Sequence, residues 1–143
     1  MIIHVDYVWV DGLASPKIRS KTKIENVAID EDGSFDLRLA AWNFDGSSTK
    51  QATTEDSERI LTPQRVYKIS DTHYAVLCEV DLPTLNGDGD PIPHESNYRR
   101  RLINKISELG DTELWIGFEQ EYFITKNGKN VLSNGCDHYY HTN

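Results

Sequence analysis

Residues 2–12 have the sequence IIHVDYVWVDG, and the first half of the chain is organised around this stretch. Its β-branched and aromatic residues, from 2 to 10, are typical of a strand. Asp11-Gly12 then supplies a dipeptide that favours a tight turn. Residues 18–24, IRSKTKI, follow as the returning strand. The stretch therefore predicts a β-hairpin at the start of the chain.

A second pair of strands is predicted further along, at residues 66–69 and 74–80, with Asp71-Thr72-His73 between them. Between the two pairs, residues 35–42 again alternate apolar and polar side chains. Residues 45–58 are rich in Gly, Ser, Thr and acids, with no sustained period. Loops of this length in compact domains are usually functional or disordered. We therefore expect a long loop there that merits attention as a site.

The second half begins at the turn-rich stretch 86–91, NGDGDP, which is the best candidate for a domain boundary. A helix is predicted from a cap at Ser96 or Asn97 to about Leu109, before Gly110. Its apolar residues fall on one face at helical spacing: Leu102, Ile103, Ile106 and Leu109. Residues 114–124 then form the strongest strand pattern of the chain, followed by a turn at Asn127-Gly128.

Composition narrows the classes of function. The 143 residues carry 23 acidic and 15 basic side chains, a formal net charge of −8, which disfavours nucleic acid and anionic membranes as partners. The first six residues already include Asp6, so no signal peptide is expected, and no apolar stretch is long enough to span a bilayer. We expect a cytoplasmic protein. Cys78 and Cys136 lack metal-ligand spacing, and Cys78 is predicted to be a buried, reduced thiol.

Two carboxylates stand out in the strand predicted at residues 114–124, LWIGFEQEYFI. Side chains alternate across a strand, so Glu119 and Glu121 would point the same way, roughly 6–7 Å apart along it. Both faces are otherwise apolar, and buried carboxylates need a positive partner to stay ionised. A pair of hard divalent cations, Mg²⁺ or Mn²⁺, is one such partner. The alternative is an acidic stripe facing solvent.

The long loop opens with residues 42–49, WNFDGSST, where aromatic residues give way to an acid, a glycine and hydroxyls. Such a loop can present Asp45 and Ser48 to a small polar ligand. The alternative is a turn that ends a strand, which this composition also favours. Arg99, Arg100 and Arg101 in the predicted helix could bind a phosphate or a carboxylate. The alternatives are a solvated face of the helix, or pairing with nearby acids. No Walker-type or dinucleotide-binding glycine motif occurs.

Four segments together resemble glutamine synthetase of the type common in eukaryotes, and they occur in the order of that family. They are residues 7–12 (YVWVDG), 18–23 (IRSKTK), 42–49 (WNFDGSST) and 117–122 (GFEQEY). The resemblance covers about residues 5–125. It implies an α+β fold, with a β-grasp-like mixed sheet in residues 1–83. Residues 84–143 would then be a truncated start of the catalytic domain, contributing a helix and a strand.

The family resemblance also implies an activity. The family makes glutamine from glutamate, ammonium and ATP through a γ-glutamyl phosphate, with Mg²⁺ or Mn²⁺. By resemblance, Glu119 would bind the metal that bridges the ATP phosphates, and Glu121 the metal nearer glutamate. Asp45, with Ser48 beside it, matches a loop that reaches into the site of a neighbouring subunit. There the carboxylate helps to bind ammonium and takes its proton. Lys50 stands where the family often has a small or uncharged residue.

The family's catalytic domain continues for some hundreds of residues, which supply further metal ligands and the groups that hold glutamate and ATP. We therefore expect residues 1–143 to be inactive alone, since two carboxylates do not fill two metal coordination spheres. An alternative is a catalytically dead module that docks on a full-length synthetase and modulates it. The resemblance also implies a homo-oligomer or an assembly with a full-length synthetase. A third hypothesis is an orphan β-grasp domain with an unrelated partner, which would not need Glu119 and Glu121.

Overall fold

The computed structural model describes residues 1–28, 37–110, 113–119, 122 and 124–130. Its internal contacts divide the chain into two units, Met1–Gly110 and Asp111–Asn143, which are described separately below. The first unit contains a six-stranded mixed sheet and the helix α1 (Tyr98–Glu108). The predicted α+β class is therefore confirmed. The predicted domain boundary between residues 83 and 84 stays a prediction.

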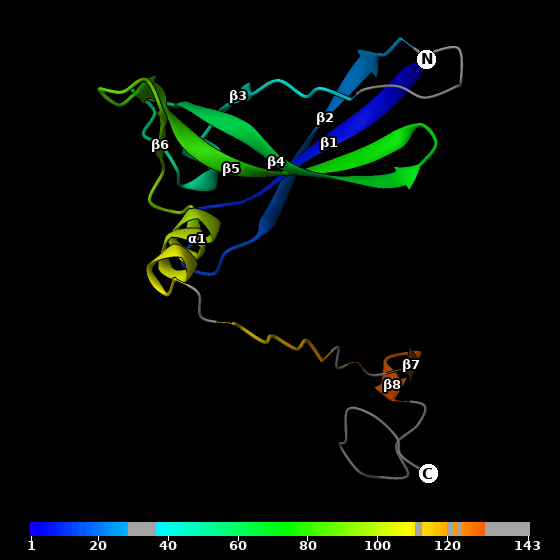
Figure 1. Cartoon of the computed structure of the whole chain (residues 1–143). Coiled ribbons are helices and arrows are strands. Elements are labelled where there is room, and N and C mark those ends of the chain that lie inside the picture. The colour runs from blue at the N-terminus through cyan, green and yellow to red at the C-terminus, as the bar shows by residue number, and fades with distance from the viewer. Residues whose placement is uncertain (29–36, 111–112, 120–121, 123, 131–143) are drawn as a thin grey trace. The chain divides into compact units, whose positions relative to one another are not determined.

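The sheet is assembled from two antiparallel pairs that meet at a parallel pair of strands. Its strand order is β2-β1-β5-β4-β3, and β6 pairs with β5 (Figure 1). The β1–β5 pair is parallel and the other pairs are antiparallel. This arrangement is consistent with the β-grasp-like sheet that the family resemblance implied. The strands are β1 (Ile2–Val10), β2 (Ile18–Asn26), β3 (Trp42–Asp45), β4 (Glu58–Ser70), β5 (His73–Leu85) and β6 (Pro91–Pro93).

The core lies on one face of this sheet, as the alternation of buried with less buried side chains along β1 and the first half of β5 shows. From Cys78 to Asp81, four consecutive residues of β5 are buried. Two aromatic contacts join β1 to β3: the rings of Trp9 and Phe44 lie 4.8 Å apart, and those of Tyr7 and Trp42 lie 5.3 Å apart, edge to face. The buried apolar residues are Ile3, Val5, Tyr7, Trp9, Phe44, Leu61, Tyr74, Val76, Cys78 and Val80.

Cys78 is a free thiol within this core, and burial raises its pKa to about 12. A thiol with so high a pKa forms almost no thiolate at neutral pH, so it is a poor nucleophile and a poor metal ligand. The prediction that Cys78 is buried is confirmed. Cys136 lies outside the described residues.

The helix α1 begins where the sequence predicted. The side chain of Asn97 caps it by accepting a hydrogen bond from the backbone N–H of Arg100, at 3.4 Å. None of its residues is buried. The predicted apolar positions, which we call the α1 stripe, are 40–56% exposed in this structure: Leu102, Ile103, Ile106 and Leu109. No helix in the described part of the chain has the length and apolarity needed to cross a lipid bilayer.

The prediction of a strand at residues 114–124 is wrong for the residues of this stretch that the structure describes. Residues 120, 121 and 123 lie outside the described residues. Residues 113–119, 122 and 124 have no regular secondary structure, and Trp115 and Phe118 are 88% and 94% exposed. A strand needs a neighbouring backbone and a cover for its apolar face, and the described residues of the second unit supply neither. The turn at Asn127-Gly128 is confirmed: it has φ of 52° and 73° and joins β7 (Thr125–Lys126) to β8 (Lys129–Asn130).

Candidate functional site

The loop between β3 and β4 carries the predicted residues Asp45 and Ser48, and both are exposed. Asp45 is the last residue of β3, and Ser48 lies in the short 3₁₀ helix η1 (Ser47–Thr49). Asp45 Oδ1 accepts hydrogen bonds from Ser47 Oγ at 2.6 Å and from the Ser47 backbone N–H at 2.9 Å. These bonds hold the pKa of Asp45 below its ordinary value. The loop therefore presents an ionised carboxylate at the surface.

The underside of this loop is buried and tightly packed. A Cβ atom at Gly46 would lie 2.8 Å from Cγ of Arg59 and 3.0 Å from Cβ of Ala52, so the backbone there approaches its neighbours too closely for a side chain. The carbonyl of Gly46 accepts from the backbone N–H of Gln51 at 2.9 Å. Arg59, 7% exposed, donates from Nε to the carbonyl of Gln51 at 2.7 Å. The loop is therefore fixed from beneath while Asp45 faces solvent.

The turn after β1 packs against the same loop. The backbone N–H of Gly12 donates to the carbonyl of Thr49 at 2.9 Å. A Cβ atom at Gly12 would lie only 2.5 Å from the carbonyl oxygen of Lys50. Asp11 is fully buried; burial alone would raise its pKa, but bonds from two backbone amides and from Arg19 Nε, at 2.8 Å, lower it. The two turns support each other, which sequence reasoning did not anticipate.

The predicted metal ligands are not brought together by the described residues. Glu119 is exposed and lies in no strand, and Glu121 lies outside the described residues. Across the described ranges, no three side chains of His, Cys, Asp or Glu gather closely enough to hold a metal ion. The residues that the structure describes therefore do not fit a divalent metal site by themselves. The assignment of Glu119 and Glu121 as ligands stays a prediction.

A different pair of carboxylates at the same spacing is buried on β5. Glu79 and Asp81 are 2% and 1% exposed. Glu79 accepts from Arg99 Nη1 and from Arg100 Nη2, both at 2.7 Å. Asp81 Oδ2 accepts from Thr62 Oγ1 at 2.5 Å, and Asp81 Oδ1 has no partner in the described part of the chain. The interpretation that arginines of the cluster pair with nearby acids is confirmed for Arg99 and Arg100.

The sequence pattern around Glu79 and Asp81 could have indicated this buried carboxylate pair. Two acids interrupt the apolar run 74–82 at alternate positions, which is the pattern that drew attention to Glu119 and Glu121. Because Arg99 and Arg100 neutralise Glu79, this cluster joins α1 to the sheet.

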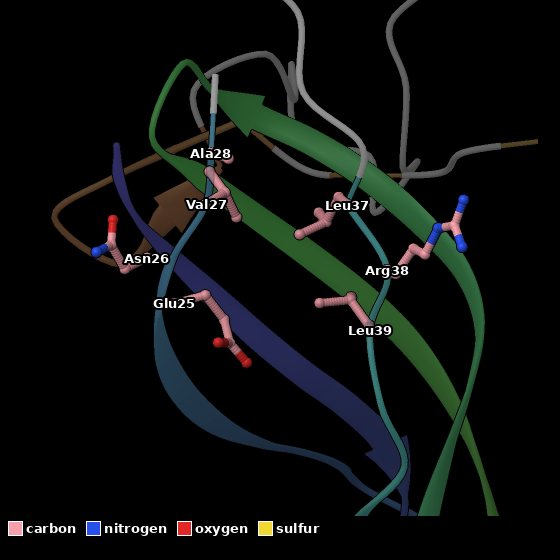
Figure 2. Close-up of a pocket in the computed structure, with 7 residues that line it drawn as sticks. All are labelled: Glu25, Asn26, Val27, Ala28, Leu37, Arg38 and Leu39. Atoms are coloured by element: carbon pink, nitrogen blue, oxygen red, sulfur yellow. The ribbon is translucent and has the colours of Figure 1, made fainter. Parts of the chain in front are cut away.

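A pocket of about 460 Å³ opens elsewhere in the first unit, between the end of β2 and residues 37–39. Figure 2 shows Leu37 and Leu39 directed toward the segment that carries Val27, whereas Arg38 points away from that segment. The lining residues are Glu25, Asn26, Val27, Ala28, Leu37, Arg38 and Leu39. None of the predicted site residues is among them, so the pocket is separate from the Asp45 loop.

The fold and the loop together define a β-grasp-like module that presents a carboxylate on a fixed loop. No family model matches the chain. It is, however, 38% identical over 130 residues to a glutamine synthetase of Bradyrhizobium diazoefficiens, a span of 87% of this chain and 33% of that protein. It is 34% identical over 131 residues to chloroplastic glutamine synthetase of Zea mays and to cytosolic isozyme 1-3 of Arabidopsis thaliana. Each span covers 90% of this chain, with 29% and 34% of those proteins respectively.

The resemblance to an amino-terminal portion of glutamine synthetase is therefore confirmed, with bacterial and plant relatives alike. The chain spans about a third of the length of the curated relatives it matches.

Proposed function

We propose that this chain supplies the amino-terminal part of a glutamine synthetase, an ATP-dependent glutamate–ammonia ligase of glutamine biosynthesis. The similarity to proteins of that name over 87–90% of the chain supports the assignment. One structural observation carries it: Asp45 is exposed and kept ionised on a loop that Gly12, Gly46 and Arg59 hold from beneath.

The chemistry of this loop suits ammonium. An ionised carboxylate attracts the cation and accepts its N–H donors. Ammonium must lose a proton before its nitrogen can attack an acyl group, and a carboxylate held at that position acts as the general base. We assign this role to Asp45, with the exposed hydroxyl of Ser48 in the same loop as a further polar contact. Asp45 would act in the site of a neighbouring subunit, in a homo-oligomer or in an assembly with a full-length synthetase.

We further propose that residues 1–143 do not synthesise glutamine by themselves. They span about a third of the relatives' length, and their described part gathers no metal-binding set of three side chains. Glutamate, ATP and the metal ions would then be held mainly by chain that these residues do not include. Glu119 and Glu121 stay proposed ligands within the larger assembly.

A second candidate function is docking on a full-length synthetase to modulate it. The observation that favours it is the α1 stripe, whose four apolar side chains are 40–56% exposed. An exposed apolar stripe on an amphipathic helix is typical of a surface that a protein partner covers.

The test is a rescue assay with ATP and Mg²⁺. A full-length synthetase whose aspartate equivalent to Asp45 is replaced by Asn is assayed alone, with the wild-type chain, and with the Asp45→Asn chain. We expect rescue only by the wild-type chain, since loss of a general base lowers the rate by roughly 10²–10⁴-fold. Equal rates with both chains, or turnover by the chain alone, would contradict the proposal. Both chains are also added to the wild-type full-length synthetase. A dose-dependent change in its rate, identical for both chains, would favour the docking module.

A further inference from the structure

Gln51 is a buried polar residue that connects three separate parts of the first unit. It is 1% exposed. Its Oε1 accepts from Trp9 Nε1 at 3.2 Å, and its Nε2 donates to the carbonyl of Val10 at 3.0 Å and to Ser96 Oγ at 2.8 Å. One side chain thus links the loop after β3, the end of β1, and the segment that precedes α1.

The backbone of Gln51 closes the Asp45 loop at the same time. Its N–H donates to the carbonyl of Gly46 at 2.9 Å, and its own carbonyl accepts from Arg59 Nε at 2.7 Å. Gly46 lies directly between Asp45 and Ser47, whose hydrogen bonds lower the pKa of the carboxylate. The backbone of Gln51, together with Thr49, therefore holds the residue that separates Asp45 from its two donors on Ser47.

We propose that Gln51 is a positioning residue for Asp45, and that through Ser96 it couples the Asp45 loop to the segment that begins α1. Ser96 is itself hydrogen-bonded to His94 Nδ1 at 2.9 Å and stands next to Asn97, the cap of α1. A displacement of this segment would pull on Gln51 and so change the loop. The importance of this coupling for ammonium rests on the proposed function; the positioning itself does not.

The chemistry of glutamine matches this position. The amide offers an acceptor to the indole N–H and two donors, one for each of the two oxygens. A glutamate would place an oxygen against the carbonyl of Val10, so two acceptors would face each other in a buried site. A methionine would keep the volume but leave Trp9 Nε1, the Val10 carbonyl and Ser96 Oγ without this partner.

The experiment measures Asp45 directly by NMR in the 143-residue protein, through its carboxyl titration and the amide signal of Ser47. The variants are Gln51→Met, Ser96→Ala and, as a control of similar destabilisation, Val76→Ala in the core. We expect Gln51→Met to raise the pKa of Asp45 toward its ordinary value, because the Ser47 donors are no longer held in place. Hydrogen exchange at residue 51 should become at least roughly tenfold faster, since several buried hydrogen bonds are lost.

Ser96→Ala should shift the pKa of Asp45 in the same direction by a smaller amount. Val76→Ala should lower Tm but leave the pKa of Asp45 unchanged. An unchanged Asp45 pKa in a folded Gln51→Met protein would show that Gln51 only packs the core, and would overturn the proposal. An unchanged pKa in Ser96→Ala would overturn the coupling to α1. Should Gln51→Met not fold, Trp9→Phe removes the indole donor to Gln51 Oε1, together with part of the ring that packs on Phe44, and is read in the same way against the Val76→Ala control. No enzyme activity enters these measurements, so a failed rescue assay leaves their outcome intact.

Discussion

Arg100 reaches from the first turn of α1 to Glu79 on β5, where its Nε and Nη2 atoms both donate to Oε2, at 3.0 and 2.7 Å. Arg99 Nη1 donates to the other carboxylate oxygen at 2.7 Å. The carboxylate side chain is 1% exposed, whereas the two arginine side chains are 41% and 40% exposed. Although burial opposes ionisation, these hydrogen bonds hold the pKa of Glu79 below its ordinary value. The cluster is therefore asymmetric: its anion is buried and its cations reach water.

This asymmetry predicts which substitution is worse. Replacing both Arg99 and Arg100 with Ala strands a buried anion and should lower the free energy of unfolding by about 3–5 kcal/mol. Glu79→Gln leaves two cations that can turn into solvent, so its cost should be smaller, about 1–3 kcal/mol. Urea denaturation of the three proteins at neutral pH measures both values. A greater loss from Glu79→Gln would contradict the argument.

Glu79 and Asp81 should make opposite contributions to the pH dependence of stability. Burial, with repulsion from Glu79, raises the pKa of Asp81 despite its bond from Thr62; Arg100 also faces this carboxyl and partly offsets the rise. Between the unfolded and folded pKa values the native state binds the extra proton, so stability falls as pH rises through that window. For Glu79 the pKa is lowered, so its stabilisation is present above its unfolded value of 4.5 and is lost as pH falls through the folded value.

We therefore expect Asp81→Asn to raise the free energy of unfolding at neutral pH, with the gain disappearing below the ordinary pKa of 3.8. Glu79→Gln should lower the free energy of unfolding at neutral pH, and its difference from the wild type should become smaller in acid. Urea denaturation at a series of pH values distinguishes the two variants. If both variants had a lower free energy of unfolding than the wild type at neutral pH, the Asp81 carboxylate would have a stabilising partner, and this account would be wrong.

The elements that depend on local pattern could be predicted from the sequence. The hairpins follow from alternation and turn residues, and α1 follows from its cap and apolar spacing. The contacts that support the Asp45 loop could not be predicted in this way. Gln51 and Ser96 are 45 residues apart in sequence, and no local periodicity indicates that they form a hydrogen bond. Residues 114–124 show the limit differently: an apolar pattern tells what a strand would bury, but not which backbone pairs with it.

Lys50 has a backbone conformation that suits glycine. Its φ of 58° and ψ of 32° lie in the left-handed region, where an L side chain costs roughly 1–2 kcal/mol. Lys50→Gly should raise the free energy of unfolding by about 0.5–1 kcal/mol, since part of the relieved strain is offset by the greater freedom of glycine in the unfolded chain. Thermal and urea denaturation measure this gain. Lys50→Ala is the control: it removes the charge but keeps the strain, and an equal gain there would attribute the effect to charge.

Gly12 allows the turn after β1 to approach the Asp45 loop, and Gly12→Ala tests that contact. The added Cβ would lie 2.5 Å from the carbonyl oxygen of Lys50 and 3.1 Å from Cγ of Gln51, so backbone has to move. We expect a loss of about 1–3 kcal/mol in the free energy of unfolding, with a rise in the pKa of Asp45 as the loop shifts. Gly87→Ala is the matched control, because nothing lies within 4 Å of its Cβ position. Equal stability of the two variants would show that the two turns are not in contact in solution, and the loop would then need another source of its rigidity.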